Sequence, residues 1–244
     1  MIASLHNGVS ALKSLTQGLQ VLGNNISNVN SLGYKASRAN YSDNFYMHMI
    51  DAESGAGGAP SNNLQQHGTG VHVGSISSDF TQGTIEVTGL DLDLAIQGEA
   101  LPNGGGFFQV IDSDTGELFY TRSGAFESTV EGKIVTRDQY RYELQGFLGE
   151  NADADGSLLV GANEGEAILA RRIEEDGKIN LVVSKDIKDP VTNEVTGSID
   201  EIRPAGRIKI SNFSSPQELK RVGNGFYSNG RGGEDLAGLS ENAI

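Results

Sequence analysis

The most regular hydrophobic pattern lies at the N-terminus, where apolar residues recur at gaps of three and four. This spacing places them on one stripe of an α-helix. The set is Ile2, Leu5, Val9, Leu12, Leu15, Leu19, Leu22, Ile26 and Val29. Most of them fall into two columns with seven-residue spacing, which is typical of helices that share a seam. We predict a long amphipathic helix; periodicity alone also allows a helix that packs on this chain's own core.

The predicted helix is weak in isolation and has a marked end. Three glycines, at positions 8, 18 and 23, each cost a helix about 1 kcal/mol, so external packing is needed. A run of residues that favour caps and turns follows, from Asn24 to Gly33. We therefore expect the helix to end between Asn28 and Gly33, with Gly33 as the left-handed residue after its last turn.

Beyond the helix the pattern changes twice. Residues Ser54–Gly74 are rich in Gly, Ser, Asn and Gln, and they predict a flexible connector that orders only in an assembly. From Val71 onward apolar residues alternate with polar ones, which indicates strands. Short strands are predicted at 71–73, 75–77, 83–88, 92–96, 107–111, 118–121, 125–128, 133–136, 142–145, 178–183 and 206–211.

The expected fold is mostly β with a long N-terminal α-helix. Turn residues at 114–116 and 130–132 suit antiparallel hairpins. The division is an assembly helix at 1–35, a connector with a first β-hairpin at 36–89, a β body at 90–228 and a loose tail at 229–244. Within the body, 148–205 is a variable β stretch.

Charge and composition exclude several classes. With 18 Lys+Arg against 32 Asp+Glu the net charge is −14, which disfavours binding to nucleic acid or anionic lipid. There is no cysteine, hence no disulfide and no thiolate site. No segment is apolar for long enough to span a membrane, and the N-terminus lacks the basic and apolar regions of a cleaved signal peptide.

No catalytic or metal motif emerges, and we predict no enzyme activity, no cofactor and no metal. The four histidines have no metal-ligand spacing. Residues Asn151–Gly156 match the opening of a calcium loop, but Ala162 stands where the bidentate Glu belongs. Carboxylate pairs such as Asp91/Asp93 and Asp112/Asp114 are expected by chance in so acidic a chain.

Four segments together resemble the bacterial flagellar hook and basal-body rod protein family. They occur in family order and cover most of the chain, least well over 148–205. The segments are Leu22–Lys35, Phe80–Val110, Tyr120–Phe147 (with Tyr120-Thr-Arg-Ser-Gly-Ala-Phe126 and Leu144-Gln-Gly-Phe147) and Ile208–Tyr227 (with Gly223-Asn-Gly-Phe-Tyr227).

The resemblance implies a non-enzymatic axial subunit that polymerises into a helical, torque-transmitting tube, with an inner ring of paired helices and β domains outside. The implied partners are further copies, neighbouring axial proteins and the type III export apparatus; no nucleic acid or membrane insertion is expected. The location would be the basal body or hook, reached without a cleaved signal peptide. The expected assembly interface is Leu5, Leu12, Leu15, Leu19, Leu22, Ile26, Asn25, Asn28, Gly33 and Tyr34.

Two questions stay open in the sequence. Family members normally close with a second long helix, whereas this chain stops at Ile244 without one, so we expect either a truncated gene product or another partner for the first helix. Hook-like segments at Phe80 and Leu144 favour a hook over a distal-rod protein slightly, although the stretch between Phe147 and Ile208 is short for a hook. A secreted adhesin-like β module is the main alternative, and an enzyme acting on polysaccharide is a distant third.

Overall fold

A computed structural model describes residues 2–51, 63–97, 106–148, 154–161, 166–174, 176–188, 195–213 and 215–229. The chain divides into two compact units. The N-terminal unit comprises Met1–Asn30 and Lys35–Asp79, and the body unit comprises Ser31–Tyr34 and Phe80–Ile244. The turn after the helix thus belongs to the body rather than to the helix.

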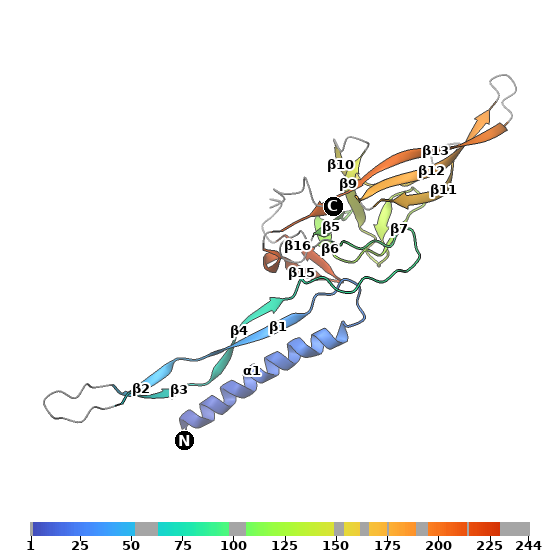
Figure 1. The fold of residues 1–244 in the computed structure, drawn as a ribbon. Coiled ribbons are helices and arrows are strands. Elements are labelled where there is room, and N and C mark those ends of the chain that lie inside the picture. The colour runs from blue at the N-terminus through green and yellow to red at the C-terminus, as the bar shows by residue number, and fades with distance from the viewer. Residues whose placement is uncertain are drawn as a thin grey trace. The chain divides into compact units, whose positions relative to one another are not determined.

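The N-terminal unit consists of one helix and two strand pairs. Helix α1 spans Ile2–Ser27. Strands β1 (Ser37–Asp43) and β4 (Val71–Ser78) pair antiparallel, as do β2 (Tyr46–Ile50) and β3 (Gln65–Gly68). Helix α1 runs beside these strands (Figure 1) and contacts β1 and β4.

Part of the predicted connector is therefore structured. Strand β3 and the first residues of β4 lie within 54–74, because β2 and β1 supply the backbone hydrogen-bond partners that this polar composition does not reveal. Residues 52–62 lie outside the described part of the chain. So does the tail from position 230, where a loose end was predicted.

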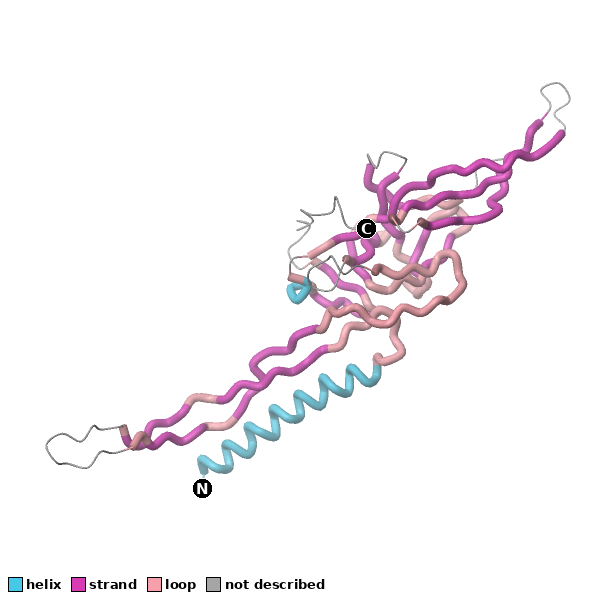
Figure 2. Tube along the Cα trace, viewed as in Figure 1, coloured by secondary structure: helices cyan, strands magenta, loops and turns pink. Residues whose placement is uncertain are grey.

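The body unit is built mainly of β-strands (Figure 2), and these strands pair antiparallel, as predicted. Its strands are β5 (Phe107–Ile111), β6 (Leu118–Thr121), β7 (Phe126–Ser128), β8 (Ile134–Thr136), β9 (Glu143–Leu148), β10 (Ala154–Ser157), β11 (Glu166–Ile173), β12 (Lys178–Lys188), β13 (Val195–Ile208), β14 (Ile210–Ser211), β15 (Lys220–Gly223) and β16 (Phe226–Ser228). A short 3-10 helix, η1, spans Pro216–Glu218. Within the described residues these strands join in one sheet, with the order β11-β12-β13-β9-β5-β6-β16-β15.

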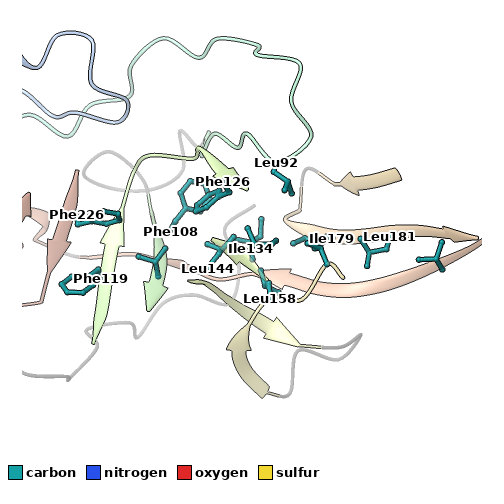
Figure 3. Packing of buried hydrophobic residues seen from close by; sticks show 14 residues of the cluster. Leu92, Phe108, Phe119, Phe126, Ile134, Leu144, Leu158, Ile179, Leu181 and Phe226 are labelled. Atoms are coloured by element: carbon teal, nitrogen blue, oxygen red, sulfur yellow. The ribbon is translucent and has the colours of Figure 1, made fainter. Parts of the chain in front are cut away.

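Two apolar clusters form the core of the body. The larger one gathers residues from β5, β8, β9 and β12, including Val110, Leu144 and Leu181, each fully buried (Figure 3). The second is aromatic and comprises Phe80, Phe107, Tyr120, Phe213 and Tyr227.

Two predicted strands are wrong. Residues 83–88 have no ladder partner, and 92–96 make only one isolated bridge, Asp93 to Ala125. Leu92, Leu94 and Ile96 still pack on the larger core cluster. The alternation of apolar and polar residues at 92–96 therefore shows that one face of the segment is buried. It does not show whether the backbone of the segment can hydrogen-bond to a neighbouring strand. The hairpin turns at 114–116 and 130–132 are confirmed: Gly116 and Gly132 both adopt positive φ there.

Candidate assembly surface

The inward face of α1 is polar and built from small residues. Ser14 is only 3% exposed, and its Oγ donates to Val71 O of β4 over 2.9 Å. Ser10 Oγ donates to the same carbonyl, and Asn7 Nδ2 donates to Gly68 O over 3.0 Å. These side chains donate hydrogen bonds to backbone carbonyl oxygens of the strands. The helix therefore docks on its own strands through hydrogen bonds.

The side chain of Tyr41 on β1 packs against the helix at Gly18. A Cβ added to Gly18 would lie 1.8 Å from the hydroxyl oxygen of Tyr41 on β1. Gly8 and Gly23, in contrast, have open space at that position. Only Gly18 of the three helix glycines is thus explained by packing within this unit. A groove of about 490 Å³ between α1 and β4 is lined by polar and apolar side chains alike, among them Gln17, Gln20 and Val21.

The outward face of α1 carries the apolar stripe. Every aliphatic residue predicted for the assembly interface is more than half exposed. The exposed fractions are Leu5 68%, Leu12 67%, Leu15 57%, Leu19 66%, Leu22 53% and Ile26 65%, with Val9 at 45%. In a lone domain an amphipathic helix turns its apolar face to the core. Here the polar face of α1 packs on the strands and the apolar face is exposed. Large exposed apolar stripes of this kind are typical of interaction surfaces, and the interface role of these residues stays a prediction.

Two predicted interface residues serve the helix end and its connection to β1. Asn25 Nδ2 donates to Ser37 O over 2.7 Å, and Asn25 Oδ1 accepts from Ser37 N over 2.9 Å. Asn28 Nδ2 donates to Asn24 O over 2.9 Å. Asn25 therefore fixes the start of β1 against the last turn of α1. Whether either residue also contacts a neighbour stays a prediction.

The other two predicted interface residues, Gly33 and Tyr34, lie in the body unit. Gly33 has φ 67°, but it lies six positions after the helix ends at Ser27, so its prediction as the left-handed residue next to the last turn is wrong. Gly33 instead lies against the backbone of the two residues that follow β6. A Cβ added to Gly33 would lie 2.7 Å from Ser123 N and 2.8 Å from Arg122 C. Only glycine fits this place.

Three of the sequence segments noted above meet at this turn. The ring of Tyr34 lies 5.4 Å from the guanidinium carbon of Arg221, which in turn is 5.8 Å from the ring of Tyr227. Thr121 Oγ1 donates to Gly225 O over 3.2 Å and ties the third segment to the fourth. These three segments thus form the seat of the turn that follows α1.

Sequence reasoning missed an exposed apolar ribbon at β2. Phe45 is 92% exposed and Met49 is 72% exposed, and neither face of the strand is covered among the described residues. The run Phe45-Tyr-Met-His-Met-Ile50 was the available signal. An isolated two-stranded ribbon is marginally stable in water, so this ribbon is a further candidate for a partner surface.

Several titratable side chains that the structure describes are held in ion pairs and turns. Among the described residues, no cluster of three or more His, Asp or Glu side chains is placed to hold a metal ion. Asp93 pairs with Arg137 over 2.7 Å, and Asp155 of the calcium-like segment pairs with Lys209 over 2.5 Å. Asp112 accepts from Asp114 N and Thr115 Oγ1, and these bonds lower the pKa of Asp112 in a turn. Asn151, Asp153 and Ala162 lie outside the described residues.

Comparison with known proteins decides the family. The model described as flagellar hook protein FlgE/F/G D1 domain matches residues 102–181, and the model described as flagella basal body rod protein matches residues 5–35. This chain belongs to the flagellar hook and basal-body rod protein family. The two matches fall on the body and on α1 with its following turn. No helix in the described residues has the length and hydropathy of a membrane span.

Relatives of this flagellar protein include both rod and hook proteins. The flagellar basal-body rod protein FlgG of Bacillus subtilis (strain 168) is 27% identical over 93% of this chain and 73% of its own length. The flagellar hook protein FlgE of Salmonella typhimurium is 36% identical over 81% of this chain. That of Borreliella burgdorferi is 27% identical over 88%. The chain spans 43% and 48% of these two hook proteins.

Proposed function

We propose that this protein is a structural axial subunit of the bacterial flagellum, which self-assembles into a helical tube through the outward face of α1. The observation that carries the proposal is the inverted amphipathicity of the helix. Its small polar residues dock on β4, while its leucines are about two-thirds exposed. A helix of this design gains its hydrophobic stabilisation only when another helix covers the stripe.

The free energy available from burying the exposed leucines favours assembly over a stripe that stays in water. Full burial of a leucine side chain is worth about 1.5–3 kcal/mol, so covering the exposed two-thirds of one is worth about 1–2 kcal/mol. Six aliphatic residues of the stripe stand exposed in this way. Their combined burial would be comparable to the stability of a small domain, and it would recur at every subunit of a polymer.

The partners and location follow from the family and are part of the proposal. They are further copies of the chain, neighbouring axial proteins of rod or hook, and the export apparatus, with export that leaves the N-terminus uncleaved. The role is structural, as the names of the relatives indicate. The comparisons give no support to an adhesin. They include rod and hook proteins alike, so hook rather than distal rod remains a prediction that rests on the segments at Phe80 and Leu144.

The test places two carboxylates in the stripe. Leu12→Asp with Leu19→Asp should abolish incorporation into hook-basal bodies, because an unpaired carboxylate buried between helices costs several kcal/mol. The matched control is Gln17→Asp with Gln20→Asp, which makes the same charge change on exposed polar positions of the same helix. Motility and counts of assembled structures are the readouts, and circular dichroism checks that each variant still folds. Normal assembly of the leucine variant would refute the proposal.

A further inference from the structure

Residues 83–88 have the sequence of a strand but no strand partner. They lie between β4 and β5, where Figure 1 draws the chain without an arrow. All of them are exposed, and no backbone hydrogen bond joins them to another residue that the structure describes. Most side chains from Thr84 to Thr88 are β-branched, which favours extended backbone. Segment 83–88 therefore has the conformational preference of a strand and a backbone available for pairing.

The side chains of segment 83–88 divide between two faces. In an extended chain Ile85 and Val87 share one face, and Glu86 points to the other. Ile85 is 41% exposed and Val87 is 98% exposed. One face of the segment is thus apolar and bare, and the other carries a negative charge. Such a strand suits a sheet edge with an apolar core on one side and a cation on the other.

Strand β11 is a sheet edge of this kind. It ends the strand order and pairs only with β12 among the described strands, so its outer row of backbone groups faces no described strand. Ile168 and Ile173 of β11 pack on the larger core cluster. Because neighbouring side chains of a strand alternate, Arg172 lies on the opposite face, where it is exposed. With eight residues, β11 is long enough to pair with the whole of segment 83–88.

The edge at the other end of the strand order, β15, fits segment 83–88 less well. It has only four residues. Its Arg221 already contacts two rings, with 5.4 Å from the guanidinium carbon to the centroid of Tyr34 and 5.8 Å to that of Tyr227. Length and an accessible cation therefore both favour β11.

We propose that segment 83–88 of one copy adds to β11 of a second copy as a further strand of its sheet. The inference rests on the proposed function, because the partner is another subunit. With Ile85 and Val87 on the side of the core cluster, Glu86 comes to lie on the face of Arg172, where opposite charges on neighbouring strands attract.

Charge and symmetry support a second copy as the occupant of this edge. Each copy carries −14, so copies repel one another unless a cation of one meets a carboxylate of the next. The donated segment and the receiving edge are different surfaces of the chain. A contact between different surfaces is heterologous and repeats from copy to copy, as a helical polymer requires.

The experiment traps the strand pair as a disulfide between copies. The chain has no cysteine, so Glu86→Cys and Arg172→Cys each introduce a single thiol. Chains with one substitution are mixed with chains that carry the other, polymerised and oxidised with copper phenanthroline. Mass spectrometry identifies the linked peptides, and every link joins two copies because each chain has one thiol. The 86–172 link should be at least tenfold more abundant than the 86–220 link of a parallel mixture with Lys220→Cys, at an exposed position of β15.

Charge reversal gives an independent measure. Glu86→Arg and Arg172→Glu should each raise the concentration needed for polymerisation at least tenfold, and the two together should bring it back to within about threefold of the unsubstituted chain. Glu86→Arg also lowers the net negative charge, which by itself would ease polymerisation. The matched control, Glu117→Arg, makes the same charge change at an exposed position of the body and should not raise the threshold.

The outcomes separate this inference from the function beneath it. Equal yields of 86–172 and 86–220 links, or 86–172 links that form as readily without polymerisation, would overturn the inference while the structural role would stand. A double reversal that polymerises no better than the single ones would overturn it as well. Failure of the unsubstituted chain to polymerise would overturn both the inference and the proposed function.

Discussion

Replacing Glu143 by Gln should destabilise the body. Glu143 is 8% exposed, and its carboxylate is held from three sides. Lys133 Nζ donates to Oε1 over 2.6 Å, Ser113 Oγ donates to Oε1 over 2.7 Å, and Ser157 Oγ donates to Oε2. Glutamine has nearly the same shape, but it removes the charge and places an N–H group at one of the two acceptor positions. The substitution therefore isolates the hydrogen bonding from the packing.

The expected loss is about 1–3 kcal/mol in the free energy of unfolding at pH 7, since hydrogen bonds to a charged group contribute more than neutral ones. Glu127→Gln is the control: Glu127 pairs with Arg141, but both side chains are largely exposed at 41% and 56%. Exposed pairs of this kind contribute about 0–1 kcal/mol. Urea unfolding followed by tyrosine fluorescence measures both variants.

The pH dependence of the free energy of unfolding gives a second readout, because the direction in which Glu143 changes it is fixed by the shift of its pKa. Burial alone would raise the pKa of Glu143, but the hydrogen bonds from Lys133, Ser157 and Ser113 outweigh it and hold the pKa below its usual value. The unfolded chain therefore binds the proton first as the pH falls. The stability that Glu143 contributes is complete above its unfolded pKa of about 4.3 and is lost as the pH falls through the folded pKa. A gap between native and variant that is absent at pH 7, or that widens below pH 4, would refute this reasoning.

Further predictions concern the N-terminal unit. Gly8→Ala and Gly23→Ala should each raise the stability of α1 by about 0.5–1 kcal/mol, because alanine favours the helix and both sites are open. Gly18→Ala should give no such gain, since its Cβ would meet a tyrosine hydroxyl at 1.8 Å. Asn25→Ala should loosen the start of β1 and cost about 1–2 kcal/mol, because two hydrogen bonds are lost. Amide exchange across residues 2–43 checks all four.

The apolar stripe of α1 could be predicted from sequence, but its direction could not. A period near 3.6 shows that leucines share one face, and it does not show what covers that face. The deciding information lies in the opposite face, where Ser10, Ser14 and Gly18 also recur at helical spacing and dock on β1 and β4. A small polar face on a long apolar helix is a signal that sequence reasoning could have used.

The hairpins of the body could be predicted well because turn chemistry is local. Gly116 and Gly132 mark their turns, and the alternating residues beside them form β5 to β8. Whether a segment pairs as a strand depends on residues distant in sequence. For this reason the prediction of strands at 83–88 and 92–96 was wrong. The seat of Gly33 and Tyr34 could not be foreseen for the same reason, because it joins segments about 90 and 190 residues apart.

The most direct test of the central claim measures access to the stripe before and after assembly. The chain has no cysteine, so Leu19→Cys introduces a unique thiol at a position that is 66% exposed. Val130→Cys, at a fully exposed position of the β7–β8 turn, serves as the reference. Maleimide labelling at position 19 should be as fast as at position 130 in the free chain, and at least tenfold slower in the polymer. Equal labelling rates at position 19 in free chain and polymer would contradict the claim that α1 assembles the tube.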